Sequence, residues 1–206
     1  MKARVSASQI IRIFSFLLMI GFVLNSDADI NKSPDQFRKE ARVAFKQSNI
    51  QKAIRKYKAA QKGYKKANNV HSLLKTSIEL MDILQKSPAH TDYKALFQQI
   101  DSLATFSQDS QMRLQVLNCK GEYYHHNHQY AKAKHALKKG LQLTEQNEAG
   151  YADALLQLYA NLIEVHMKVW ESDQADQYFR KAKGLRKAHR VKHQIVTSDL
   201  YNNYGA

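Results

Sequence analysis

Residues 121–143 have the sequence GEYYHHNHQYAKAKHALKKGLQL, and the spacing inside this stretch predicts the fold. Small residues stand at Gly121, Ala133 and Gly140, and Leu137 is the large residue between the last two. Two antiparallel helices approach closely only where small side chains lie between them, and a large side chain fills the gap to the next pair. The stretch therefore predicts a helix hairpin that stacks on its neighbours.

The same pattern recurs along the chain. The residues that correspond to Gly121 are Ala41, Met81 (with Leu80) and Ile163, so the repeating unit is about 40 to 42 residues long. A second helix follows each of them, although the second helix of the second unit is degenerate in sequence. Repetition of this kind is typical of proteins built from stacked helix pairs.

These motifs resemble the tetratricopeptide repeat family. Gly121–Tyr124, Gln129–Ala133 and Ala136–Leu143 look like its small-x-x-Tyr, aromatic-x-x-Ala and Ala/Gly-Leu-x-Leu signatures. The longer unit is similar to the variety found in bacterial sensors and regulators. The resemblance implies an all-α, right-handed superhelical solenoid of antiparallel helix hairpins. The repeats would lie near 34–67, 69–107, 114–147 and 156–189, with an incomplete fifth at 197–206.

Composition and periodicity also favour an all-α chain. Seven glycines and two prolines are too few for the turns of a sandwich or barrel. Apolar residues recur at three- and four-residue steps, and no stretch alternates as a strand does. Ser33–Pro34 and Ser87–Pro88 fit helix starts, because Ser caps a helix and Pro suits its first turn. We expect about nine helices of roughly 15–20 residues.

The first 28 residues have the features of a secretory signal peptide. A basic segment precedes the uncharged apolar run 13–24, and Ser26–Ala28 is a suitable cleavage site. The run is shorter than the ~20 residues that a membrane span needs. The alternative is an uncleaved anchor or a buried N-terminal helix. With 1–28 removed, residues 29–206 form the predicted repeat domain.

The single cysteine bears on where the chain resides. One Cys excludes an internal disulfide framework. An exported chain without disulfides fits a bacterial periplasm or cell envelope better than a secreted eukaryotic domain.

Positive charge is concentrated in the expected second helices. The chain has 32 Lys and Arg against 18 Asp and Glu, a formal net charge of +14. This surface is either a solvated face that keeps the protein soluble or a binding surface for an acidic partner or an anionic membrane. Nucleic acid is disfavoured for an exported chain. The residues of this basic surface are Lys52, Arg55, Lys56, Lys132, Lys138, Lys139, Arg180, Lys181, Arg186 and Lys187.

The first helices carry the candidate binding face. In the tetratricopeptide repeat family, ligand contacts come from fixed positions around the small residue of each first helix. The resemblance implies a concave face that is basic at one end and mixed beyond, which suits an acidic or extended peptide, or a partner helix. It lacks the Lys/Asn combination of the family's clamp for C-terminal carboxylates. The implied residues are Arg38, Arg42, Phe45, Lys46, Asp82, Gln85, Asn118, Glu122, His125, His126, Glu164 and Lys168.

Two further groups were weighed as chemical sites. His125, His126, His128 and His135 suit a transition metal by residue type, but they fall at an expected turn with few carboxylates nearby. Cys119 lies within an apolar helix without a base in reach, which favours a buried residue over a nucleophile. No phosphate-binding loop, nucleophile elbow or zinc-protease motif is present in the sequence. We therefore expect no catalytic residue, metal or cofactor, and an enzyme is disfavoured.

Two functions remain after these exclusions. The first is an exported scaffold that binds a protein or peptide, as the sensory input region of a larger membrane-bound signalling protein. The second is an electrostatic binder of an anionic membrane surface or a polyanion. Tyr204–Ala206 resembles the start of another repeat. A piece of a longer protein, or an array closed by another chain or a second copy, would explain that ending.

Overall fold

A computed structural model describes residues 32–87, 93–145 and 147–189. Over these ranges the chain is all-α and contains no strand, which confirms the predicted fold class. The segments 1–28 and 197–206, where a signal peptide and an incomplete fifth repeat are expected, lie outside the described residues. The helices are α2 (Pro34–Lys46), α3 (Ile50–Lys66), α4 (Val70–Gln85), α5 (Lys94–Ala104), α6 (Ser110–His126), α7 (Tyr130–Thr144), η1 (Ala149–Tyr151), α8 (Ala152–Lys168) and α9 (Ser172–His189).

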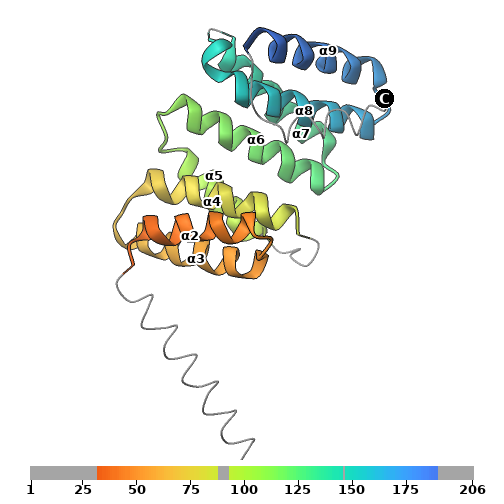
Figure 1. Ribbon diagram of the computed structural model, residues 1–206. Coiled ribbons are helices and arrows are strands. Elements are labelled where there is room, and N and C mark those ends of the chain that lie inside the picture. Colours follow the sequence, from red (N-terminus) through yellow and green to blue (C-terminus); the bar gives the residue numbers. More distant parts are fainter. Residues whose placement is uncertain (1–31, 88–92, 146, 190–206) are drawn as a thin grey trace, which may run out of the picture.

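The helices pack as successive pairs that stack in sequence order, from α2 and α3 at one end to α8 and α9 at the other (Figure 1). Each second helix also contacts the next first helix, so that α3 packs on α4, α5 on α6 and α7 on α8. The first helices α4, α6 and α8 contact one another as well. Their side chains therefore share one side of the stack. The helices α6 and α8 each begin four residues before the repeat expected there.

The same turn geometry joins the two helices in three of the four helix pairs. Ser48, His128 and Trp170 have φ of 57°, 57° and 62° and each stands two residues after a helix end. The next N–H in each case returns to the helix, as in Asn49 N–H to the carbonyl of Ala44 at 2.9 Å. A residue in the left-handed region is a common stop signal for a helix.

The α4–α5 connection is the exception. It runs from Lys86 to Tyr93, and α5 has only 11 residues, which is shorter than the sequence predicted. The position 40 residues after Ser48 is Pro88, which lies outside the described residues. The proline ring fixes φ near −65°, so a proline is chemically incompatible with a left-handed stop. The described part of α5 begins at Lys94, and the expected helix start at Ser87–Pro88 includes Pro88, which lies outside the described residues.

The expected start at Ser33–Pro34 is confirmed. Ser33 Oγ accepts the N–H of Gln36 at 3.2 Å, and Gln36 Oε1 accepts the N–H of Ser33 at 2.8 Å. These reciprocal bonds satisfy two donors that a helix start otherwise leaves unpaired.

Small residues lie where the helices approach most closely, as the spacing predicted. A Cβ added to Gly121 would lie 2.4 Å from Cδ2 of Leu137, within the α6–α7 pair. A Cβ added to Gly140 would lie 2.8 Å from Cδ2 of Leu158, in the next pair. Both glycines are buried. The small–large–small pattern therefore sets both the contact within a pair and the contact between pairs.

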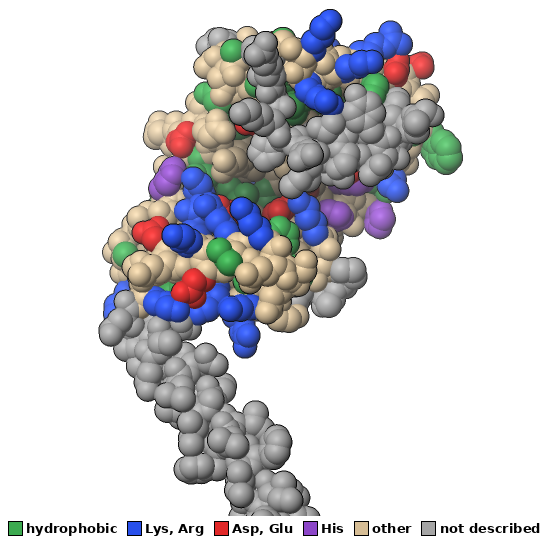
Figure 2. Space-filling model, in the orientation of Figure 1, with side chains coloured by type: hydrophobic (Ala, Val, Ile, Leu, Met, Phe, Trp, Pro, Cys, Tyr) green, Lys and Arg blue, Asp and Glu red, His purple; other side chains and the backbone are tan. Residues whose placement is uncertain are grey.

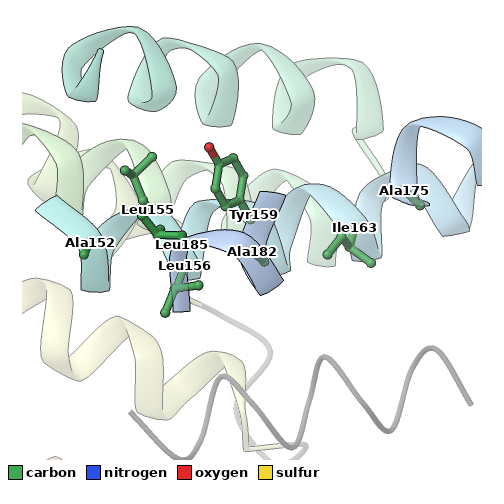
Figure 3. Close-up of a cluster of buried hydrophobic side chains, with 8 residues drawn as sticks. All are labelled: Ala152, Leu155, Leu156, Tyr159, Ile163, Ala175, Ala182 and Leu185. Atoms are coloured by element: carbon green, nitrogen blue, oxygen red, sulfur yellow. The ribbon is translucent and has the colours of Figure 1, made fainter. Parts of the chain in front are cut away.

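The last pair is closed in the same way (Figure 3). Ala175 and Ala182 on α9 are fully buried against Leu155, Tyr159 and Ile163 on α8. Alanine at these two positions allows α9 to approach α8. Among the described residues, no helix is both long enough and apolar enough to cross a bilayer.

Candidate partner-binding groove

A groove of about 240 Å³ lies where α4, α6 and α8 come together. We call it the α4–α6–α8 groove. Polar side chains share its lining with apolar ones, among them Ile78 and Leu114. On the face drawn in Figure 2, acidic side chains lie among clustered Lys and Arg side chains over α2 to α4. The polar residues that line the groove are Lys75, Glu79, Asp82, Gln115, Asn118, Glu122 and Gln157.

Two asparagine side chains hold Glu122 in this groove. Asn118 Nδ2 donates to Glu122 Oε1 at 2.9 Å, and Asn161 Nδ2 donates to the same oxygen at 3.0 Å. Asn161 Nδ2 also donates to Asn118 Oδ1 at 2.8 Å, which joins α8 to α6. Both amides reach Oε1, so among the described residues Oε2 is left for a ligand.

The environment of Glu122 also changes its charge. Burial raises the pKa of Glu122 to about 7; the hydrogen bond from Asn161 opposes this, and the charge of Asp82 adds to it. The charge of Lys86 also opposes the rise in the pKa of Glu122, but it does not offset burial. A carboxylate that is partly dehydrated and forms no ion pair gains most from a cation brought by a ligand.

Glu79 is paired at the α2 end of the groove. Arg38 donates to it from Nε at 3.0 Å and from Nη2 at 2.7 Å, and Arg42 Nη2 donates at 2.5 Å. Burial alone would raise the pKa of Glu79, but the bonds and charges of the two arginines more than offset this and hold it below its usual value. Two arginines share this one carboxylate, so the α2 end keeps a net positive charge, although both guanidinium groups already have a partner.

The remaining predicted residues of α2 and α4 have other surroundings. Phe45 packs on the apolar cluster of the first pair, and Lys46 is exposed at the end of α2. Asp82 accepts from Lys86 at 2.7 Å. The amide of Gln85 is buried, and neither its nitrogen nor its oxygen has a partner within the described part of the chain.

The histidines separate into different environments. His125 Nδ1 lies 3.7 Å from Glu164 Oε2, and burial, followed by the charges of His126 and Lys168, lowers the pKa of His125 to about 4. His126 and Lys168 are exposed at the ends of their helices. His135 lines a different hollow, between α6 and α7. Within residues 32–87, 93–145 and 147–189, no group of three or more His, Cys, Asp and Glu could hold a metal ion.

Cys119 lies beneath the groove and is buried. Burial, with smaller contributions from Glu122 and Asp82, raises the pKa of its thiol. These surroundings favour the neutral thiol over the nucleophilic thiolate.

The residues of the basic surface differ in their contacts: some form ion pairs, some line hollows, and the rest are exposed. Lys56 Nζ lies 2.9 Å from Glu40 Oε2 and 5.0 Å from the ring centre of Phe37. Arg180 pairs with Asp176 within α9. Lys132 and Lys139 line hollows beside α6 and α7. The other members are exposed: Lys52, Arg55, Lys138, Lys181, Arg186 and Lys187.

Sequence analysis missed Glu79 and Asn161, which complete the two polar clusters. A signal for both was present in the repeat length. Glu79 is 41 residues after Arg38, and Asn161 is 43 residues after Asn118. Polar residues one repeat apart on first helices are therefore candidates for direct contact.

A scan against protein-family models and searches of curated proteins and of solved structures found no match for this chain. Its function is therefore argued from the groove itself.

Proposed function

We propose that this protein is an exported helical-repeat scaffold that binds an extended peptide segment of a partner protein in the α4–α6–α8 groove. The observation that carries the proposal is Glu122, a partly dehydrated carboxylate that Asn118 and Asn161 orient and that forms no ion pair with a described residue. A side chain in such surroundings costs stability, which a binding role explains.

We also propose that the helix pairs form a right-handed superhelical solenoid similar to tetratricopeptide repeats. Packing of the pairs in sequence order supports this, as does the close approach at Gly121 and Gly140. In a stack of this kind the first helices face one another across a continuous surface, which suits an extended ligand.

The partner segment carries a Lys or Arg side chain at the position that meets Glu122. Among the described residues that line the groove, Lys75 is the one basic side chain against the three carboxylates of Glu79, Asp82 and Glu122, so the lining favours a basic segment over an acidic one. A ligand cation would replace lost hydration at Glu122 and would form a charge-assisted hydrogen bond with Oε2.

Peptide selection tests this proposal. The full chain is immobilised and a displayed library of random peptides of about 12 residues, which span about 40 Å when extended, is selected on it. We expect enriched peptides to contain a Lys or Arg whose replacement by Ala weakens binding at least about tenfold, or about 1.4 kcal/mol. The same peptides should bind Glu122→Gln at least about tenfold more weakly.

Glu122→Gln is a suitable variant because a Gln side chain keeps an oxygen that accepts from both asparagines. Lys58→Gln, at an exposed position on α3, is the matched control and should bind normally. A selection without enrichment, or enriched peptides that bind Glu122→Gln as well as the parent, would contradict the proposal.

A further inference from the structure

A second surface lies on the other helices of the stack. Two neighbouring hollows, of about 460 Å³ and 370 Å³, open beside α6 and α7 and share Leu117 and Lys139 in their linings. We call them together the α6–α7 trough. None of its residues is among those that line the α4–α6–α8 groove.

The short α5 explains why this surface is open. α5 has 11 residues, whereas α7 has 15 and α9 has 18, and it ends at Ala104 on the edge of the larger hollow. A longer second helix would continue past this point and cover more of α6. Apolar side chains of Val116, Leu117 and Leu143 are therefore left to line the larger hollow.

The charge of the trough has one sign. Its basic lining residues are Arg113, Lys120, Lys132, His135 and Lys139, and no described residue that lines it is acidic. Lys120 pairs with Asp101 on α5, and Lys132 Nζ lies 5.7 Å from the ring centre of Tyr124. Arg113 and Lys139 are exposed and form no ion pair with a described residue.

The shape suits a helix. On α6 the lining residues run from Arg113 to Tyr124, which at 1.5 Å per residue is about 17 Å, or about three helical turns. An apolar channel between two antiparallel helices, with two hollows in a row, accepts side chains spaced at i and i+4 or i+7 on a third helix.

We propose that the α6–α7 trough binds an acidic amphipathic helix of a partner protein. Apolar side chains of that helix occupy the two hollows, and its Asp or Glu side chains pair with Arg113 and Lys139. This site is separate from the α4–α6–α8 groove, so its occupant and the extended peptide bind independently.

A designed peptide tests the proposal on the full chain. The probe is a fluorescent peptide of about 12 residues, long enough for three helical turns, with Leu at the i, i+4 and i+7 positions and Glu on the opposite face. We expect it to bind the parent protein, and Lys139→Glu to weaken binding at least about tenfold. Arg113→Glu should have a similar effect.

Lys138→Glu is the matched control. It makes the same charge change at the neighbouring exposed residue of α7, which does not line the trough. We expect it to change the affinity less than about threefold. Glu122→Gln should leave binding of this probe unchanged, which separates this proposal from the previous one.

Several results would overturn the inference. The first is that the probe does not bind the parent protein. The second is that Lys138→Glu weakens binding of the probe as much as Lys139→Glu does. The third is that a peptide of the same composition in scrambled order binds as tightly as the probe. A different result would assign the surface to a membrane or a polyanion instead. In that case the protein would bind phosphatidylglycerol vesicles or polyglutamate but not the helical probe, and Lys139→Glu would abolish that binding.

Discussion

Glu122 combines two properties that rarely occur together in a structural residue. Its Oε1 is fully used by Asn118 and Asn161, while burial keeps its pKa near 7. A neutral amide would satisfy the same donors without the cost of a dehydrated charge. At the scale of single residues, folding alone therefore does not require an ionisable carboxylate at position 122.

The effect of Glu122 on stability has a definite sign. Its pKa of about 7 in the folded protein exceeds the usual Glu value of about 4.3 in an unfolded chain. Between these values the folded state binds more protons, so the contribution of Glu122 to stability falls as pH rises through this window. Glu122→Gln removes that loss.

We expect Glu122→Gln to match the parent in stability near pH 4 and to exceed it by about 3 to 4 kcal/mol near pH 8. Urea denaturation of both proteins across this range measures the difference. The contrary result is a difference in free energy of unfolding between the two proteins that stays constant or falls as pH rises. That result would show that the carboxylate of Glu122 ionises normally in the folded protein.

At the scale of elements, ion pairs join helices that are one repeat apart. Arg38 and Arg42 on α2 both reach Glu79 on α4, and Lys134 on α7 reaches Glu171 at the start of α9 at 2.8 Å. The two arginines differ in exposure, since the side chain of Arg38 is 13% exposed and that of Arg42 is 50% exposed. Their contributions to stability should differ accordingly.

Both arginines bind Glu79 at two points, so burial is what distinguishes them. We expect Arg38→Ala to lower the free energy of unfolding by about 2 kcal/mol, because it removes the more buried partner of a partly buried carboxylate. Arg42→Ala is the matched control and should cost less than about 1 kcal/mol, as exposed pairs do. Denaturant unfolding at neutral pH measures both. Equal costs would show that burial does not distinguish the two pairs.

The pH dependence provides a second check on the same variant. The pKa of Glu79 lies below its usual value, so its pairing stabilises the protein above the ordinary carboxylate range and is lost as pH falls through the lowered pKa. Arg38→Ala should reduce that loss in acid. Reversal of both arginines to Glu would instead place three carboxylates together and destabilise the α2–α4 contact, so it is a poor probe of binding.

At the scale of the whole molecule, each helix pair contacts mainly its neighbours in the chain. Such an array is stabilised by its pairs and by the junctions between them, so one junction can open while others remain closed. Leu158 lies at the junction between α7 and α8, where it fills the space beside Gly140.

We expect Leu158→Ala to cost about 3 kcal/mol, since it leaves a cavity at a fully buried position. Amide hydrogen exchange should lose protection in α6 to α9 and retain it in α2 to α4. Met167→Ala, at an exposed position on the same helix, should leave the exchange pattern unchanged. Equal loss of protection in every helix would mean that the described helices unfold as one cooperative unit.

The sequence by itself determined the all-α class, the helix start at Ser33, and the small residues at which helices meet, such as Gly121 and Gly140. These features depend on local periodicity, on capping chemistry and on side-chain size, all of which are visible in a short window. The resemblance to tetratricopeptide repeats also implied that Asn118 and Glu122 lie on one face, because that family's ligand contacts come from these positions of the first helix.

Only the tertiary structure decided how charges are distributed over that face. Glu79 binds both Arg38 and Arg42, while Glu122 receives only amide donors, and no local pattern distinguishes these two glutamates. Whether side chains about 40 residues apart are in contact depends on the rotation and crossing angle of neighbouring helices. A shift of one residue along a helix turns the side chain by about 100° around the helix axis. For the same reason the hollow left by the short α5 became apparent only when the helices were packed together.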